Sequence, residues 1–253
     1  MIAPLFISHG GPDVLITPSA AHKAMSSLPL PDGLRAILIV SAHWEAEPIR
    51  VQTMAQPSTI HDFRGFGPEL ERATYTAPGA PGIAETVLET LRSAGIEAVA
   101  EPARGRDHGA WIPMALIRPQ ADIPVFQVSL PDSDAAAIAL GRTLAPLAEQ
   151  DVLIIGSGSL THSLRLAFSH GEYDPPHPAA QAFREALLPA IQSGDAGELE
   201  DWEAAPHARL NHPTPEHFRP LLVAMAAGGG KASLLHTSWS RAALAMDIWK
   251  FAA

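Results

Sequence analysis

The sequence predicts an α/β fold, a single domain with a mostly parallel central sheet and helices on both faces. Apolar, β-rich runs alternate with stretches of helical periodicity along the chain, which is typical of βαβ units. Several of these runs are apolar without interruption, as in strands that helices cover on both sides. The 253 residues suffice for one large domain, and no linker divides them, so we expect one catalytic domain over residues 1–253.

The predicted strands are the apolar or β-branched runs that lie between turn signals. They are Ala3–Ser8, Ala36–Ser41, Ile49–Thr53, Glu97–Ala100, Pro124–Ser129, Val152–Gly156 and Lys231–Thr237.

The predicted helices have end signals of the expected kinds. Gly95 follows one of them, and Thr214-Pro215 supplies an N-cap with proline at the first helical position of another. The predicted helices are Ser19–Ser27, Pro81–Ala94, Ala110–Ile117, Ala135–Glu149, Pro178–Gln192 and Pro215–Ala227.

Composition narrows the possible functions. The chain has no cysteine, which excludes disulfides, thiolate nucleophiles and iron–sulfur clusters, so any metal must bind to nitrogen and oxygen. The net charge of −10 provides no basic surface for nucleic acid or an anionic membrane. A small molecule is therefore the expected ligand.

The expected location is the cytoplasm. No apolar run reaches the roughly 20 residues of a membrane-spanning helix. The N-terminus has neither the basic start nor the cleavage site of a secretory signal, and it continues directly into a predicted strand.

Histidine is the unusual feature of the composition, with twelve residues against two tyrosines. Three histidines follow predicted strands. His9 and His43 come just after two of them, and His162 follows a third through a glycine-rich turn. Because ligands of open α/β sheets bind outside the carboxyl ends of the strands, these side chains are expected to share one site.

Two more histidines are placed near helix starts. His217 is expected in the first turn of the helix that begins at Pro215, where the helix dipole keeps an imidazole neutral and able to bind a metal. His108 lies at a boundary between loop and helix, beside Asp107.

A single buried histidine is more often a hydrogen-bonded core residue than a metal ligand. The metal site is favoured because several histidines are expected at the same place in the fold. His22, His170, His177 and His207 lie in polar or loop sequence and are expected on the surface, whereas His212 and His236 are not assigned.

The glycine-rich turn after the third strand does not indicate another chemistry. Gly156-Ser-Gly158 lacks the Walker lysine and the dinucleotide-binding pattern, which argues against nucleotide binding. Ser157 and Ser159 do not fit the Gly-x-Ser-x-Gly register of a nucleophile elbow, so a serine hydrolase is not expected.

A set of motifs resembles the LigB-type class III extradiol ring-cleavage dioxygenases, in their DOPA 4,5-dioxygenase-like branch. The resemblance runs from about residue 3 to about residue 240. The motifs, in chain order, are Phe6-Ile-Ser-His9-Gly10, Val40-Ser-Ala-His43-Trp44, Thr59-Ile-His61-Asp62-Phe63-Arg-Gly65-Phe66, Tyr75-Thr-Ala-Pro78-Gly79, Asp107-His108-Gly109-Ala-Trp111, Asp122-Ile-Pro124-Val-Phe-Gln127-Val-Ser129-Leu, Gly156-Ser-Gly158-Ser-Leu-Thr-His162 and Asn211-His-Pro-Thr-Pro215-Glu-His217-Phe.

The resemblance implies roles for particular residues. It implies that His9, His43 and His217 are metal ligands, and that His162 is an acid/base that could approach the metal as a fourth ligand. It implies a catalytic role for His108, either behind the metal ligands or turned toward the substrate. His61, in the pocket wall, and Asp107 are expected to bind substrate. Many extradiol enzymes use two histidines and one carboxylate instead, whereas the third position here is His217.

The implied reaction opens the ring of a catechol with dioxygen at Fe(II). The expected partners are therefore a small aromatic diol and O2, and the expected state is a monomer or homodimer. Iron is required because Zn(II) has no accessible redox state, although imidazole also binds Zn(II), which could occupy the site.

The alternative is a zinc hydrolase that uses the same histidines to activate water, with His162 or Asp107 as base. A third alternative is a non-catalytic binding or signalling role on the same scaffold. The loops His61–Tyr75 and Phe168–Pro178 are predicted to carry the residues that select the substrate.

Overall fold

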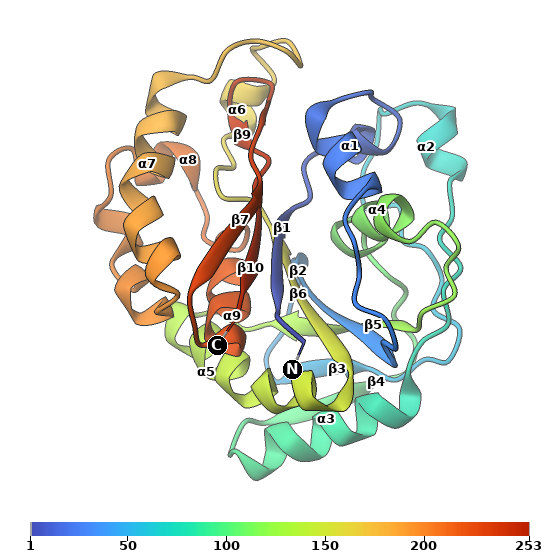
Figure 1. The fold of residues 1–253 in the computed structure, drawn as a ribbon. Helices are drawn as coiled ribbons and strands as arrows, with labels where there is room; N and C mark the ends of the chain where they lie inside the picture. The colour runs from blue at the N-terminus through green and yellow to red at the C-terminus, as the bar shows by residue number, and fades with distance from the viewer. Residues whose placement is uncertain (1, 253) are drawn as a thin grey trace.

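The computed structural model describes residues 2–252, and it is an α/β structure built on a mixed, mostly parallel sheet (Figure 1). The eight strands lie in the order β4-β3-β5-β2-β6-β1-β10-β7. They comprise β1 (Leu5–Ser8), β2 (Ala36–Glu45), β3 (Ile49–Gln52), β4 (Ala98–Glu101), β5 (Val125–Leu130), β6 (Val152–Gly158), β7 (Ala232–His236) and β10 (Ile248–Phe251). The predicted fold class is confirmed.

The central strands β5, β2, β6 and β1 pair in parallel, as their uninterrupted apolar sequences predict. Antiparallel pairs occur toward the two edges, where β3 joins β5 and where β10 lies between β1 and β7. A separate two-stranded hairpin is formed by β8 (Trp239–Ser240) and β9 (Leu244–Ala245).

Helices cover both faces of the sheet (Figure 1). Residues of β2 alternate between the two cores, because Leu38 and Val40 belong to one and Ile37 and Ile39 to the other. The α-helices are α1 (Ala20–Ser26), α2 (Pro68–Arg72), α3 (Pro81–Ser93), α4 (His108–Ile117), α5 (Asp134–Leu144), α6 (Leu164–Ala167), α7 (Pro178–Ser193), α8 (Ala208–Asn211) and α9 (Arg219–Gly228). Short 3-10 helices are η1 (Pro12–Leu15), η2 (Ala145–Gln150), η3 (Ala196–Leu199) and η4 (Trp202–Ala204).

Two proline positions shorten helices relative to the prediction. The predicted helix Ala135–Glu149 is α-helical only to Leu144 and continues as the 3-10 helix η2, which contains Pro146. The helix predicted from Pro215 begins at Arg219, because Pro220 has no N–H to donate to Glu216 and disfavours helical geometry before it. His217 therefore lies in a turn before α9, not in its first turn as predicted.

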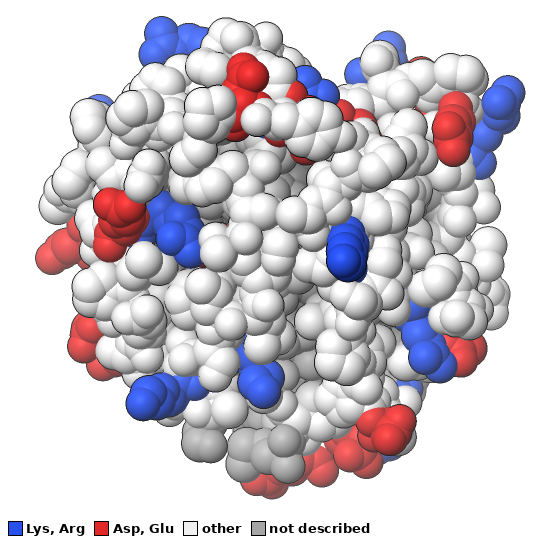
Figure 2. All heavy atoms as spheres, turned by 45° about the horizontal axis from the view of Figure 1, so that its top comes forward, with Lys and Arg blue, Asp and Glu red and all other residues white. Residues whose placement is uncertain are grey.

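None of the helices within residues 2–252 has the length and apolar character that crossing a membrane requires. Lys and Arg side chains are scattered singly over the face in Figure 2, which therefore carries no continuous basic patch.

Candidate active site

The neighbouring strands β1, β6 and β2 bring three histidines to one edge of the sheet. His9 follows β1 directly, and His162 follows β6 after a short turn. His43 lies within β2, which continues to Glu45 and is longer than predicted. Because β6 pairs in parallel with both β1 and β2, the carboxyl ends of all three strands lie side by side.

Four of the predicted histidines meet there. The Nε2 atoms of His9 and His43 are 3.1 Å apart. The ring of His217 has its centroid 4.8 Å from that of His43 and 5.5 Å from that of His9. The ring of His162 stacks on that of His217, with centroids 3.5 Å apart and planes inclined by 9°.

His108, the first residue of α4, is a fifth member of the cluster. Its ring centroid lies 3.9 Å from that of His43, and its Nδ1 lies 2.9 Å from Asp62 Oδ1. Ring nitrogens of His9, His43 and His108 lie within 4.8 Å of one another, as do the ligand atoms of His162, Glu216 and His217. Either His108 or His217 is therefore close enough to the His9–His43 pair to be a third metal ligand.

In His9 and His217, the Nδ1 atom of the ring lies within hydrogen-bond distance of a side-chain oxygen. His9 Nδ1 lies 3.0 Å from Ser157 Oγ, and His217 Nδ1 lies 2.8 Å from Glu216 Oε1. Metal-ligating histidines are commonly fixed through their second nitrogen in this way. Because Nδ1 of His217 carries the hydrogen that Glu216 accepts, its Nε2 is the atom with a lone pair.

The surroundings of His217 Nε2 show whether these residues fit a metal ion. His217 Nε2 is buried and has no hydrogen-bond partner among the described residues. A buried acceptor without a partner is costly, whereas coordination to a metal would satisfy it. The chain has no thiolate, and a cluster of neutral imidazoles suits iron and zinc. The donor set therefore fits a mononuclear metal.

Burial and neighbouring histidines keep the rings neutral. Burial lowers the pKa of His43 to about 3 and that of His162 to about 4. Burial first, and then the other histidines, also lower the pKa of His9 and of His217 well below its ordinary value of 6.5. Neutrality of His217 is thus explained by its burial and its neighbours rather than by the helix start that the sequence predicted.

The histidines line a cavity of about 740 Å³. Its walls include Phe63, Phe66, Leu164, Phe168 and Leu244, so a largely apolar and partly aromatic surface faces the polar cluster. Phe63 and Phe66 come from the predicted loop His61–Tyr75, and Phe168 begins the predicted loop Phe168–Pro178. A cavity of this kind accommodates a small aromatic molecule.

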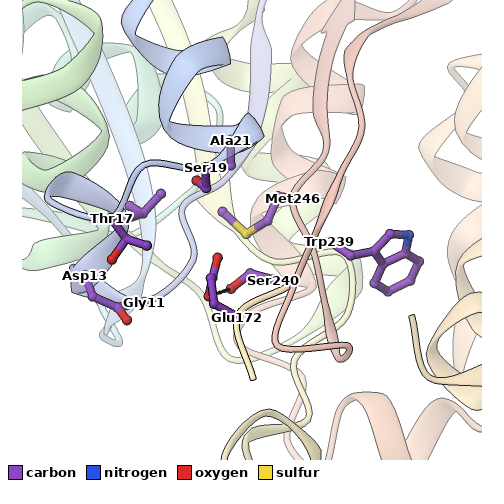
Figure 3. Close-up of a pocket in the computed structure, with 10 residues that line it drawn as sticks. Gly11, Asp13, Thr17, Ser19, Ala21, Glu172, Trp239, Ser240 and Met246 are labelled. Carbon is purple, nitrogen blue, oxygen red and sulfur yellow. Dashed lines mark hydrogen bonds between the residues drawn. The ribbon is translucent and has the colours of Figure 1, made fainter. Parts of the chain in front are cut away.

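One rim of the cavity is fixed by charged residues from distant segments. Arg241 Nη2 lies 2.7 Å from Asp13 Oδ2, and both residues line the cavity. Figure 3 shows the residues around an adjoining hollow, where Ser240 Oγ donates to Glu172 Oε2 over 2.7 Å. The volume of this hollow is about 10 Å³. This hollow is too small for more than a water molecule and belongs to the rim.

Two predicted substrate-binding residues lie off the cavity wall. Asp107 is fully buried, and its carboxylate accepts from Ser41 Oγ over 2.7 Å and from Gln127 Nε2 over 2.8 Å. His61 Nε2 lies 2.8 Å from the Ala73 carbonyl oxygen, and neither His61 nor Asp107 is among the residues that line the cavity. Both residues occupy supporting positions.

Several site residues were missed in the sequence. Asp62 reaches His108, Ser157 holds His9, and Arg104 Nη2 donates to the His43 carbonyl oxygen over 3.1 Å. Glu216, beside His217, also lines the cavity. Asp62 and Glu216 are next to His61 and His217 in the sequence motifs. A carboxylate directly beside a histidine was therefore the sequence signal that could have identified these two residues.

A cavity with neutral histidines at the carboxyl edge of a parallel sheet defines a class of metal-dependent enzyme acting on a small molecule. The family model for the catalytic LigB subunit of aromatic ring-opening dioxygenase matches residues 19–246. The chain belongs to this family.

Proteins similar to this chain define the reaction more closely. The 4,5-DOPA dioxygenase extradiol of Beta vulgaris is 40% identical over 264 residues, covering 97% of this chain and 95% of that protein. The 4,5-DOPA dioxygenase extradiol of Escherichia coli (strain K12) is 36% identical and covers 90% of this chain and 85% of that protein. A crystal structure of an uncharacterized protein from Escherichia coli K12 has a TM-score of 0.81 and 29% identity, covering 99% of this chain and 100% of that one.

The chain is therefore a metal-dependent extradiol dioxygenase, which opens the aromatic ring of a catechol-type substrate with O2. The predicted family, fold and reaction type are confirmed. The relatives give the zinc hydrolase alternative no better support.

Proposed function

We propose that His9, His43 and His217 hold Fe(II), that His162 is the acid/base, and that His108 assists as a second catalytic histidine. The observation that carries the proposal is the buried Nε2 of His217, which has no hydrogen-bond partner among residues 2–252 and belongs to the same ring cluster as the His9–His43 pair. Fe(II), when bound, supplies the oxygen activation that Zn(II) lacks. Zn(II) is expected to occupy the same ligands without supporting turnover.

The protein side chains handle the protons. His162 is neutral at pH 7, because burial lowers its pKa to about 4. It can therefore take a proton from a catechol hydroxyl as the substrate binds and return it later. The ring of His108 lies beside that of His43, with its Nδ1 2.9 Å from Asp62 Oδ1.

The cavity supports binding of an aromatic diol. Phe63, Phe66 and Phe168 provide apolar contacts for the ring, and they line the same cavity as the histidine cluster. DOPA is the first substrate to test, since it is in the names of the similar enzymes from Beta vulgaris and Escherichia coli. The proposal also treats residues 1–253 as one cytoplasmic catalytic domain that acts as a monomer or homodimer.

The test is reconstitution of the metal-free protein under anaerobic conditions with either Fe(II) or Zn(II). DOPA, protocatechuate and other catechols are then added, air is admitted, and oxygen uptake is followed together with the yellow absorbance of a ring-opened semialdehyde. We expect turnover with Fe(II) and none with Zn(II). Oxygen uptake that is equal with both metals, or absent with every catechol, would contradict the proposal.

A further inference from the structure

His212 lies behind the active site and takes no part in the proposed chemistry. It is 3% exposed, and its ring is surrounded by Phe183, Trp202 and Phe218 at centroid distances of 5.4 to 5.6 Å. Burial lowers its pKa to about 4, so the ring is neutral at pH 7 and carries a single N–H.

The tautomer of His212 follows from its one contact. Its Nε2 lies 3.0 Å from the Leu160 carbonyl oxygen, and a carbonyl can only accept, so Nε2–H is the donor. Nδ1 is then an acceptor, and it has no partner among the described residues. Burying an acceptor without a partner costs free energy, so the bond from Nε2 to Leu160 is the one hydrogen bond by which the ring offsets its burial.

The bond from His212 ends on the loop that carries His162. In this loop, Ser159 N–H donates to the His217 carbonyl over 2.8 Å, and His162 N–H donates to the Asn211 carbonyl over 2.9 Å. Leu160 lies between these two contacts and its carbonyl is held by His212. Three hydrogen bonds therefore join the loop after β6 to residues 211–217, which run from the last residue of α8 to the turn before α9.

That segment also carries His217. The stacked rings of His162 and His217 therefore project from two loops whose backbones are joined behind them, and His212 is the only side chain among these three links. Catalysis by a general acid/base depends steeply on placement of the reacting nitrogen.

We propose that His212 is a positioning residue, whose Nε2–H bond to Leu160 holds the acid/base His162 in register with His217. This inference rests on the proposed role of His162. It predicts that loss of the bond lowers kcat while leaving the metal and the cavity wall in place.

The test compares three substitutions in the Fe(II)-loaded enzyme. His212→Gln places an amide N–H near the position of Nε2, whereas His212→Asn places the same group closer to the backbone, near the position of Nδ1. His212→Leu removes the donor. We expect His212→Gln to retain most of kcat, and the other two to lose about tenfold to a hundredfold with KM little changed.

Two further measurements separate positioning from general loss of structure. Zn(II) affinity of the metal-free variants is expected to match that of the wild type. Hydrogen exchange in the segment 159–162 is expected to quicken in His212→Asn but not in His212→Gln. If His212→Leu fails to fold, the Gln and Asn variants still decide the question, because they carry the same amide and differ by the one methylene that sets its position.

Equal kcat values for the Gln and Asn variants would overturn the inference, as would loss of Zn(II) binding in parallel with activity. Failure of the wild-type enzyme to consume oxygen with any catechol would instead contradict the proposed function, so the two failures are distinguishable.

Discussion

His162 and His217 both line the cavity and present nearly parallel faces to each other, yet of the two only His217 has a ring nitrogen bonded to a carboxylate. This difference is consistent with the proposed roles, in which His217 is a ligand held in place and His162 exchanges a proton. We predict that His162→Ala lowers turnover by about 10²-fold or more, since general acid/base catalysis contributes 10²–10⁴-fold. The metal content, measured on the same sample, should stay at the wild-type value.

Two outcomes would contradict this assignment. Turnover at the wild-type rate would remove His162 from the reaction. Loss of the metal from His162→Ala would indicate that His162 is a fourth ligand, which the sequence left open.

Asp107 allows a second test at the residue scale, because its buried carboxylate holds Ser41 and Gln127. We predict that Asp107→Asn destabilises the fold by about 1–3 kcal/mol through a mismatched buried hydrogen bond. Chemical denaturation measures this loss, and KM for a catechol should change little in the folded variant. A large rise in KM at unchanged stability would restore the substrate-binding role that the sequence predicted.

The sequence reveals residues whose chemistry and strand position coincide. His9, His43 and His162 were found because each stands at or near the carboxyl end of an apolar strand. Asp62 and Ser157 were missed because their contacts to His108 and His9 span 46 and 148 residues of chain. Such pairings depend on the folded loops, which have no periodic signal.

At the scale of elements, the close approach of β6 to α9 fixes where His217 can lie. A Cβ atom at Gly156 would overlap the Pro220 carbonyl oxygen, and one at Gly158 would overlap the His217 carbonyl oxygen. These glycines therefore allow the turn that carries His217 to lie directly on the strand. From the sequence, these glycines indicated only a glycine-rich turn after the strand.

We predict that Gly158→Ala costs about 1–3 kcal/mol in stability, as overpacking does, and weakens Zn(II) binding because the backbone of His217 must move. Gly82→Ala is the matched control. Gly82 lies in α3 with nothing within 4 Å of an added Cβ, so alanine should stabilise that helix by about 0.5–1 kcal/mol. Wild-type Zn(II) affinity in Gly158→Ala would show that this contact does not position His217.

Whether a segment forms a helix or a strand was predictable where its hydrophobic pattern extends over many residues. The residues at which the elements begin and end were not predictable. The seven predicted strands all correspond to strands of the sheet, whereas β10 and the β8–β9 hairpin were missed; β8 and β9 have only two residues each. The surface assignments were only partly right: His207 is exposed, but His177 is partly buried and its Nδ1 accepts from Ala179 N at the start of α7.

At the scale of the whole molecule, the parallel sheet with two covered faces was predictable, because apolar runs of this kind have few alternative folds. The sequence predicted where the cavity lies, at the carboxyl ends of the strands, but not its shape. Its shape depends on loops such as that of Phe63 and Phe66, whose ring centroids lie 5.6 Å apart. Tertiary contacts rather than local preferences determine those conformations.

The buried histidines make the stability of the metal-free molecule depend on pH. Burial lowers the pKa of His162 and His212 to about 4 and that of His43 to about 3, against 6.5 for an unperturbed histidine. Between about 6.5 and about 4 the unfolded chain therefore binds protons that the folded chain does not, and acidification favours unfolding.

We predict that the thermal midpoint of the metal-free protein falls steadily from pH 7 to pH 5, each such histidine contributing at most about 1.4 kcal/mol per pH unit. Calorimetry of the chelator-treated protein measures this. A midpoint that stays constant or rises toward pH 5 would mean that these rings are protonated in the folded protein.

The most direct test of the central claim is the origin of the oxygen atoms in the product. The Fe(II)-loaded enzyme is supplied with a catechol and ¹⁸O₂ in ordinary water, and the product is reduced with borohydride at once so that its aldehyde cannot exchange. Mass spectrometry is predicted to find both labelled atoms in the ring-opened product. A product that takes its new oxygen from water would contradict dioxygenase action at this histidine site and would favour hydrolysis.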